Sequence, residues 1–476
     1  MEISLIQPKH LRGPDRIYEP LGLGYIASYL MQKGYKDISI HSATFESDKK
    51  IVKEAALADI VGITAMSPMM THANILASAI KRKNPKAIIV LGGFHPSALP
   101  EATLNNKNID FVVRGEGEET FYELVKAAEK MHGFEDISGI SYRYDGRVIH
   151  NQPRELIDDL DTIPYPARHL FGQKDFTRKY YQYLGERRVT VLSSRGCPFE
   201  CRFCSSQCVW ARKWRSRSAK SIIIEIKDLI DRYNVEYIDF LDGIFTLNKQ
   251  RVLDFCNMLI CDKIKISWGC YVHVTTVDKE MLAVMKEAGC REIYIGVESG
   301  SAVILKELNK KISVEGIINT CRIAKDISLS ILALIVIGFP EEDRNTIKKT
   351  EDLINKIKPD YVAFNILTPM PGCDYYEYAK QKGYVNNNTD WSEVDWDKAT
   401  MPTRHLSIED INKEYKRLRK KFVCFSRKKR FNLHYFFSKG IIKFKNIPIS
   451  ELNFLVFKLY KYIKFSILIR LFKVKD

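Results

Sequence analysis

The chain has 476 residues, a formal net charge of +16 and 11 cysteines. This length predicts two to four domains. No run of 18 apolar residues occurs, so we expect no transmembrane helix. The first six residues form a strand-like apolar run rather than a basic leader, and the cysteines are few and odd in number. We therefore expect no signal peptide and a reducing, cytoplasmic location.

The positive charge is concentrated at the C-terminal end. Residues 405–476 hold 19 Lys and Arg against 5 Asp and Glu, whereas the preceding 404 residues hold 55 against 53. The body of the protein is therefore nearly neutral, and the basic character belongs to the tail.

Residues 1–135 alternate short apolar runs with helix-like segments. The expected strands are 3–6, 38–40, 60–64, 87–91 and 111–113, and the expected helices are 21–33, 48–58, 71–83 and 118–130. This alternation predicts a parallel α/β domain of flavodoxin-like (Rossmann-like) type, which binds ligands at the carboxyl edge of its sheet. Gly92 and Gly93 follow the fourth strand and permit close backbone approach there. Gly22 and Gly24 lie far from the turn after the first strand, so we interpret them as helix-packing residues rather than a dinucleotide fingerprint.

Residues 136–187 indicate a connector. A hairpin is expected from 140–144 and 148–150 around the Asp145-Gly146 turn, and the acidic, proline-containing stretch 155–168 follows it.

Six further strands, each followed by a helical pattern, are expected in residues 188–383. They are 188–194, 236–242, 266–273, 292–298, 331–338 and 360–367. Six such units predict a partial (β/α)6 barrel related to the TIM barrel, with its chemistry at the carboxyl edge. Residues 384–476 are expected to form a small helical region with a basic, aromatic-rich tail.

Three cysteines stand close together after the first of these strands. No cysteine precedes Cys197, and Cys201 and Cys204 complete a Cys-x3-Cys-x2-Cys element. Structural zinc and ordinary ferredoxin sites take four protein ligands, so three local thiolates suggest a cubane with one open iron. Two alternatives remain: a four-ligand zinc or ferredoxin-like site that includes Cys208, and a chance group of inert buried thiols.

This element, with the aromatic Phe203 before its last cysteine, resembles the signature of the radical S-adenosylmethionine (SAM) superfamily. Residues 1–385 further resemble cobalamin-binding-domain radical SAM enzymes, which include class B methyltransferases and anaerobic magnesium-protoporphyrin ester cyclases. The motifs that carry the resemblance are PLGLGY (20–25), GGFHP (92–96), VRGEGE (113–118), DGIFT (242–246), GVESG (296–300), GFPEE (338–342) and PMPG (369–372).

The resemblance implies a 4Fe–4S cluster on Cys197, Cys201 and Cys204. Its open iron would bind the amino and carboxylate groups of SAM, and one electron would release a 5′-deoxyadenosyl radical. Three anionic thiolates favour a cluster potential on the order of −400 mV or below, where such an electron transfer is feasible.

The resemblance also implies the residues around SAM. Phe203 would face the adenine, Glu298 would accept ribose hydroxyls, and Gly338 would permit close approach of the adenosine. Asp242 and Gly243 would lie near the methionine ammonium. A helix cap or a loop salt bridge is the alternative role for Glu298 and Asp242.

For cobalamin, the resemblance implies contacts from Gly92, Gly93, Thr64 and Ser67. The chain has no Asp-x-His-x-x-Gly motif, so we do not expect a lower axial histidine, and His95 is expected to shape the corrinoid or a loop. A degenerate domain without cobalamin is the alternative.

One histidine is a possible catalytic residue. His273 ends the third barrel strand, where it could donate a proton or orient the substrate. An ordinary polar residue with satisfied hydrogen bonds is the alternative.

The leading functional hypothesis is radical methyl transfer to an unactivated carbon of a small or lipid-like substrate, with ferredoxin or flavodoxin as electron donor. Oxidative cyclisation or rearrangement without methyl transfer is the second hypothesis. Methylthiolation is set aside, because it needs a second cysteine-held cluster in the N-terminal domain. A non-enzymatic iron–sulfur protein is the last alternative.

The tail permits two kinds of partner. Its basic run 427–430 and its aromatic residues suit nucleic acid or an anionic membrane surface. We favour peripheral membrane attachment through residues 405–476, with nucleic acid as the less favoured partner.

Overall fold

The computed structural model describes residues 1–11, 17, 19–386 and 389–430, without the side chains of residues 183 and 423–430. The chain divides into a compact unit, Met1–Arg419, and a second unit, Lys420–Asp476, of which only the end of helix α16 (Ile408–Arg430) is described. No helix of the described residues is long and apolar enough to cross a membrane. Most of the basic tail lies outside the described residues, so its proposed roles stay predictions.

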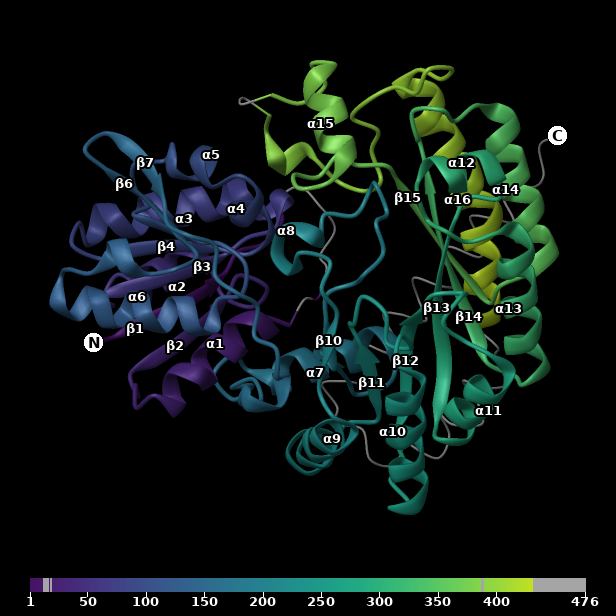
Figure 1. Ribbon diagram of the computed structural model, residues 1–476, viewed down its shortest axis with the longest axis horizontal. Coiled ribbons are helices and arrows are strands. Elements are labelled where there is room, and N and C mark those ends of the chain that lie inside the picture. Colours follow the sequence, from purple (N-terminus) through teal and green to yellow (C-terminus); the bar gives the residue numbers. More distant parts are fainter. Residues whose placement is uncertain (12–16, 18, 387–388, 431–476) are drawn as a thin grey trace, which may run out of the picture. The chain divides into compact units, whose positions relative to one another are not determined.

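The N-terminal part of the first unit contains the predicted parallel sheet (Figure 1). Its strand order is β2-β1-β3-β4-β5, the order of flavodoxin-like domains. The strands are β1 (Ile3–Gln7), β2 (Ile38–Ser42), β3 (Ile60–Thr64), β4 (Ile88–Gly92) and β5 (Phe111–Val113). The helices are α1 (Leu21–Gln32), α2 (Asp48–Ala55), α3 (Met70–Lys83), α4 (Phe94–Ala98), α5 (Pro100–Leu104) and α6 (Glu118–Lys130).

Helices cover both faces of this sheet. Leu5 and Val125 belong to the core that α1 and α6 close, while Ile6 and Leu76 belong to the core on the side of α2 and α3. Both faces are thus buried by apolar contacts, and the sheet's carboxyl edge is left for ligands.

The predicted hairpin forms, but it does not belong to a separate connector. β6 (Ile140–Tyr144) pairs antiparallel with β5 and with β7 (Arg147–His150), so the sheet has seven strands. Asp145 and Gly146 both have positive φ, at 48° and 72°, as a tight two-residue turn requires. The connector proper is therefore shorter than residues 136–187.

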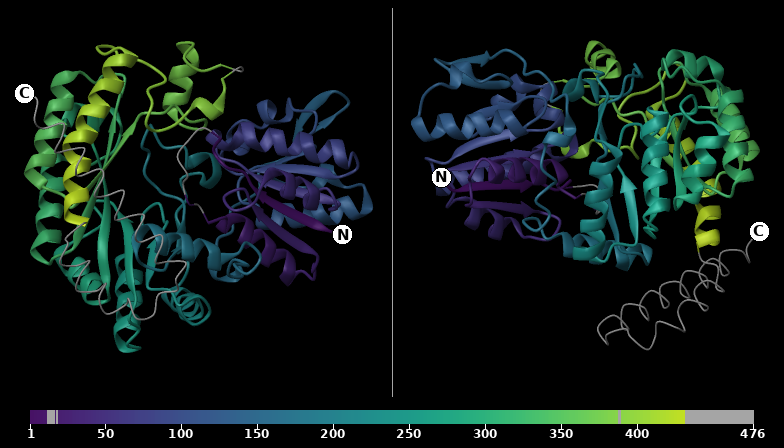
Figure 2. Two further views of the ribbon diagram at one scale, coloured as in Figure 1. Left: turned by 180° about the vertical axis from the view of Figure 1, so that it is seen from behind. Right: turned by 60° about the horizontal axis from the view of Figure 1, so that its bottom comes forward.

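The predicted barrel forms a parallel sheet (Figures 1 and 2). It has six strands in the order β15-β14-β13-β12-β11-β8. Its strands are β8 (Arg188–Val191), β11 (Tyr237–Phe240), β12 (Ser267–Val272), β13 (Cys290–Glu298), β14 (Ser330–Ile337) and β15 (Tyr361–Ile366). Its helices are α9 (Ala219–Tyr233), α10 (Lys249–Cys261), α11 (Lys279–Glu287), α12 (Ala302–Glu307), α13 (Val314–Asp326) and α14 (Arg344–Ile357). Buried aromatic rings, among them Phe240, Phe255 and Trp268, pack between the sheet and α10.

Shorter elements complete the first unit. They are η1 (Ser67–Met69), η2 (Phe134–Asp136), η3 (Leu160–Thr162), α7 (Gln173–Leu184), β9 (Ser194–Arg195), α8 (Gln207–Trp210), β10 (Arg215–Ser216), α15 (Asp374–Gln381) and η4 (Trp391–Glu393). β9 and β10 pair with each other and frame the segment that carries the three cysteines.

Candidate cofactor sites

The three cysteines lie on the loop between β9 and α8, at the carboxyl end of β8. Gly196 opens this loop with φ +84°, and a Cβ there would lie 1.9 Å from the carbonyl oxygen of Lys213, so no other residue fits. Burial raises the pKa of the Cys197 thiol, and it raises that of Cys201 to about 11. Because metal binding needs thiolates, ligation here must displace these protons.

The thiols are close neighbours but are spaced too widely for one tetrahedral ion. Cys197, Cys201 and Cys204 interact electrostatically with one another. Zn–S bonds of about 2.3 Å require sulfur atoms about 3.8 Å apart. Among the described residues, only one group of possible metal ligands has three atoms that all lie within 4.8 Å of one another, and it consists of His41, Glu46 and Glu54. The three cysteine sulfurs are therefore not all within 4.8 Å of one another. The cysteine loop therefore fits a larger cluster better than a zinc ion.

Cys208, the possible fourth ligand, has other neighbours. Its Sγ lies 3.7 Å from the carbonyl oxygen of Phe94, and a Cβ on Gly372 would lie 3.1 Å from it. Burial raises its pKa to about 12. These contacts favour a packing role for Cys208 and leave three thiols for the cluster.

Glu298 lies where the sequence places it, at the end of β13. Its φ is +58°, a strained value for this residue type, and its side chain is buried. The carboxylate forms an ion pair with Lys310 at 2.8 Å between Oε1 and Nζ. A Cβ on Gly296 would lie 2.6 Å from both atoms, so this glycine makes room for the pair. The ribose-binding role of Glu298 stays a prediction.

Phe203 and Gly338 belong to the same region. The Phe203 ring lies edge-on to Phe339 at 6.2 Å between centroids, and the ammonium of Lys310 is 5.8 Å from it. Gly338 has φ +91°, and its N–H donates to Oε2 of Glu342. The structure thus brings Phe203, Glu298 and Lys310 together beside the cysteine loop.

Asp242 is engaged by the protein itself. Its carboxylate accepts hydrogen bonds from the Ser193 backbone N–H at 2.7 Å and from the hydroxyls of Ser193 and Ser194 at 2.5 and 2.7 Å. Arg251 lies 3.7 Å from it. These contacts favour the alternative structural role, in which Asp242 ties β11 to the segment before the cysteines. Gly243 is the neighbour of the loop, since a Cβ there would lie 3.5 Å from Cβ of Cys197.

His273 packs against the cysteine loop. Its ring stacks on Phe199 at 3.9 Å, its Nδ1 contacts Thr275 Oγ1 at 2.7 Å, and its Nε2 lies 3.4 Å from the carbonyl oxygen of Lys310. Burial, assisted by the Lys310 charge, lowers the pKa of His273 to about 4, so the imidazole is neutral at pH 7. Both nitrogens have partners, which favours the satisfied polar role.

A second site lies at the carboxyl edge of the N-terminal sheet. A cavity of about 160 Å³ is lined mainly by apolar atoms and glycines. The glycines are Gly22, Gly62, Gly92, Gly93, Gly115 and Gly117. A Cβ on Gly22 would meet nothing within 4 Å, so any side chain there would project into open space. A cavity with this lining leaves room for a largely apolar part of a bulky ligand such as cobalamin.

The other predicted cobalamin residues divide into two groups. Thr64 lines the cavity with Gly92 and Gly93. Ser67 does not line it, and its Oγ instead lies 2.9 Å from Nδ1 of His95. The His95 ring packs edge-on against Trp391, and burial lowers its pKa to about 4. His95 thus shapes a loop, as the sequence suggests.

The glycine pair of α1 has two different roles. A Cβ on Gly24 would lie 2.9 Å from atoms of Pro166 and Phe171, which confirms helix packing at this position. The same interpretation is wrong for Gly22, which lines the cavity.

Helix α8, which follows the cysteine loop, supplies part of the cavity wall. Val209 and Trp210, which follow Cys204 closely, line the cavity together with Arg195. Buried ion pairs fix this arrangement. Arg195 bonds to Glu116 at 3.0 Å and to Glu118 at 2.6 Å, and Arg215 bonds to Glu116 at 2.8 Å.

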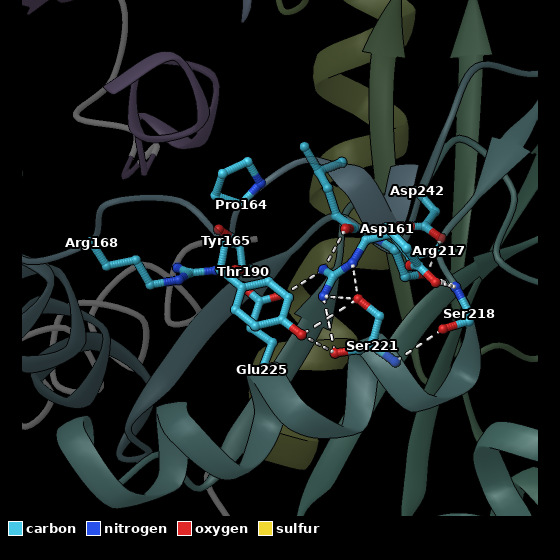
Figure 3. Close-up of polar contacts among 12 residues, drawn as sticks. Asp161, Pro164, Tyr165, Arg168, Thr190, Arg217, Ser218, Ser221, Glu225 and Asp242 are labelled. Carbon is cyan, nitrogen blue, oxygen red and sulfur yellow. Dashed lines mark hydrogen bonds and ion pairs between the residues drawn. The ribbon is translucent and has the colours of Figure 1, made fainter. Parts of the chain in front are cut away.

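A second buried network holds the connector to the barrel (Figure 3). Arg168 donates to Glu225 at 3.1 Å and to the carbonyl oxygen of Thr190 at 2.8 Å. Arg217 donates to Glu225 at 2.5 Å and to Ser221 Oγ at 3.1 Å. Burial alone would raise the pKa of Glu225, but the two guanidiniums hold this pKa below its usual value. The N-terminal half of α9 is thereby fixed to the connector and to β8.

The sequence interpretation missed Lys310 and the Arg195–Glu116 pair. Glu116 and Glu118 belong to the VRGEGE motif, but their shared partner Arg195 lies 79 and 77 residues further along the chain. For Lys310, the available signal was the run Asn309-Lys310-Lys311, which follows the Glu298 motif closely. Nothing in this run distinguishes a buried lysine from an exposed one.

Comparisons with known proteins agree with this geometry. Residues 14–125 match the B12 binding domain family, and residues 191–354 match the radical SAM superfamily. An uncharacterized methyltransferase of Pyrococcus horikoshii, PH0819, is 36% identical over 439 residues, which cover 89% of this chain and 92% of that protein. The anaerobic magnesium-protoporphyrin IX monomethyl ester cyclase of Rubrivivax gelatinosus is 28% identical over 391 residues, covering 79% and 70%.

Solved structures share the fold. The cobalamin-dependent SAM radical enzyme OxsB with aqua-cobalamin bound has a TM-score of 0.71 at 19% identity and covers 98% of this chain and 71% of its own. The methyltransferase TsrM from Kitasatospora setae, with cobalamin and a 4Fe–4S cluster bound, has a TM-score of 0.67 at 18% identity, covering 81% and 76%. The predicted fold class, enzyme class and cofactors (SAM, cobalamin and a 4Fe–4S cluster) are confirmed at the level of the family. The chain belongs to the radical SAM superfamily, in the family of enzymes that carry an N-terminal B12-binding domain.

Proposed function

We propose that this enzyme transfers a methyl group to an unactivated carbon of a small or lipid-like substrate. One observation carries the proposal: the glycine-lined cavity of the N-terminal sheet has a wall built from Val209 and Trp210, directly after the cysteine loop. A methyl donor held in the cavity and a radical source held by the cysteines would thus be neighbours. Such proximity is what a reaction between two cofactors and one substrate needs.

The site residues have distinct parts in this proposal. When bound, the cluster supplies one electron to the sulfonium of SAM and the corrinoid supplies a methyl group. Cys197, Cys201 and Cys204 hold the cluster. Phe203 and Gly338 contact the adenosine. Glu298 accepts hydrogen bonds from the ribose hydroxyls of the adenosine.

The remaining residues preserve the geometry of the site. The Gly243 backbone approaches the methionine end, because its missing side chain leaves space beside Cys197. Asp242 positions the cysteine loop through Ser193 and Ser194. Neutral His273 supports Phe199 by stacking and has no imidazolium proton to donate at pH 7.

The substrate class is inferred from the names of relatives. The 36% identical relative is named a methyltransferase, and a 24% identical relative in Methylococcus capsulatus is a hopanoid C-3 methylase. The solved structure of TsrM with its substrate contains tryptophan. Together they support a small molecule with an extended apolar part. An electron donor such as ferredoxin or flavodoxin completes the reaction.

The proposal is tested with anaerobically purified protein incubated with trideuteromethyl-labelled SAM, a flavodoxin reducing system and a lipid and small-molecule extract. We expect 5′-deoxyadenosine, S-adenosylhomocysteine and a product that gains a deuterated methyl group. The Cys204→Ala variant should form no deoxyadenosine. Cys261→Ala, which changes an exposed cysteine of α10, should behave as wild type.

The same measurement separates the alternative reactions. A product that loses hydrogens without gaining the label would show cyclisation or rearrangement and would contradict methyl transfer. Deoxyadenosine formation by Cys204→Ala at the wild-type rate would contradict the cluster assignment itself.

A further inference from the structure

Leu241 is an exposed apolar side chain at the carboxyl end of a barrel strand, and the proposed function gives it no role. It directly follows β11 and is 44% exposed. The other exposed large apolar residues in the described part of the chain lie on helices, in loops or in the N-terminal sheet. A single exposed leucine is common on protein surfaces, but the carboxyl ends of barrel strands are where this kind of fold binds its ligands. The surroundings of Leu241 therefore decide what its exposure means.

The side chain of Leu241 lies on the inner face of the barrel. Successive residues of a strand point to opposite faces of the sheet. Phe240 is fully buried and packs against Phe255 of α10, which covers the outer face. Leu241 continues the strand, because its N–H donates to the carbonyl oxygen of Val191 in β8 at 2.9 Å. Its side chain is therefore directed to the inner face.

On this face Leu241 has a neighbour that belongs to the cofactor cavity. Val191 and Phe240 are paired in the sheet, so the residues that follow them, Leu192 and Leu241, are neighbours across β8 and β11. Leu192 lines the glycine-lined cavity of the N-terminal sheet. The inner face of the barrel thus continues into the wall of this cavity at Leu192.

The cysteine loop lies on the other side of Leu241. Asp242 is held by the backbone N–H of Ser193, and a Cβ on Gly243 would lie 3.5 Å from Cβ of Cys197. In the proposed reaction, the carbon to be methylated lies between a methyl donor in the cavity and a radical source at this loop. Leu241 is placed beside that position.

The inner face of the barrel is apolar and only partly covered elsewhere too. In β14, Leu332, Leu334 and Val336 are partly exposed, whereas the residues that alternate with them are buried. A closed and filled barrel would bury the inner set as well. Binding an apolar group against this face removes its exposed area from water, which is favourable.

We propose that Leu241 is a specificity-determining residue that contacts an apolar part of the substrate next to the carbon that is methylated. This inference rests on the proposed function, because it assumes that both cofactors bind where the cavity and the cysteine loop place them. The chemistry of the surface specifies the substrate class: a hydrocarbon chain or ring system with no charged group close to the reacting carbon. A charged group there would lose its hydration against Leu241 and Leu192 without gaining a partner from either.

The test uses anaerobic protein loaded with cluster and cobalamin, trideuteromethyl-labelled SAM, and increasing amounts of the chloroform-soluble fraction of a lipid extract. We expect wild type to label a product from this fraction and none from the water-soluble fraction. Leu241→Asn should need about tenfold or more of the lipid fraction for half-maximal labelling, because a polar amide of similar size replaces the apolar contact. Its SAM affinity and iron content should stay within about twofold of wild type.

Matched variants show whether the apolar character of the side chain is what matters. Leu241→Met keeps an apolar side chain of similar volume and should recover most of the labelling that Leu241→Asn loses. Ile224→Asn makes a similar change at an exposed residue of α9 and should match wild type. Leu241→Ala replaces Leu241→Asn in the comparison if the latter loses iron or fails to fold.

The contrary results separate this assignment from the proposed function. An unchanged half-maximal amount of lipid fraction in Leu241→Asn, or an equal impairment in Leu241→Met, would overturn the assignment. A parallel loss of SAM affinity would overturn it in favour of a role in cofactor binding. Labelling of the water-soluble fraction alone would overturn the substrate class. Deoxyadenosine formation by wild type without any labelled product would contradict the proposed methyl transfer itself, and this assignment with it.

Discussion

The carboxyl edges of the two parallel sheets have opposite chemical character. The edge of the N-terminal sheet is lined by glycines and apolar side chains and forms a cavity. The edge of the barrel holds three thiols, an ion pair between Glu298 and Lys310, and a carboxylate, Asp242, bound by serines. A large cofactor that brings its own reactive centre needs mainly space and shape from the protein. A cluster and a small charged cosubstrate need donor atoms and compensating charges.

The strongest way to separate the two edges is to remove one thiol. Cys201→Ala should lower the iron content to background and abolish SAM cleavage, because the loop then has too few ligands. Corrinoid affinity should stay within about threefold of wild type, since Cys201 does not line the cavity. Iron analysis and a corrinoid absorption titration measure the two effects. Complete loss of corrinoid binding would show that the edges are not separable.

The reciprocal change fills the cavity. Gly22→Leu places a side chain where a Cβ meets nothing within 4 Å, and leucine favours the helix over glycine. We expect at least about tenfold weaker corrinoid binding with unchanged iron content, since the fold is preserved while the cavity is occupied. Gly22→Ala serves as the control with a smaller loss. Unchanged corrinoid affinity in Gly22→Leu would mean that the ligand binds elsewhere.

This comparison also shows what sequence could predict. The apolar runs predicted every parallel strand to within a few residues, because buried parallel strands are nearly continuous apolar segments. The cysteines were found for a similar reason, since their spacing in the chain is itself the chemical signal. Asp242 and Lys310 depend instead on side-chain contacts, with Ser193 49 residues away and with Glu298 12 residues away. The sequence pattern carries no record of such contacts, so the role of Asp242 was predicted differently and that of Lys310 was not predicted.

The Arg195–Glu116 cluster links the two edges, and its removal tests how far they depend on each other. Glu116→Gln leaves the buried Arg215 without its anionic partner and leaves Arg195 with Glu118 alone, so we expect a loss of about 3 kcal/mol in the free energy of unfolding. Glu119→Gln removes a partly exposed partner of Arg154 and should cost less than about 1 kcal/mol. Denaturant unfolding monitored by tryptophan fluorescence gives both values. Equal losses in the two variants would show that the buried cluster has no special role.

The smallest effect concerns His95, a buried histidine of α4, the helix that follows β4. Its pKa is about 4 in the folded chain against 6.5 for an ordinary histidine, so below pH 6.5 only the unfolded chain gains this proton. The folded state therefore loses stability as pH falls from about 6.5 to 4, by about 1 kcal/mol at pH 5.5. His95→Asn keeps a polar group near Ser67 but does not titrate. The difference in unfolding free energy between wild type and His95→Asn should thus shift by about 1 kcal/mol between pH 7.5 and 5.5, in favour of the variant. Parallel pH profiles would mean that His95 accepts a proton in the folded enzyme and that its surroundings are more open to water than its burial indicates.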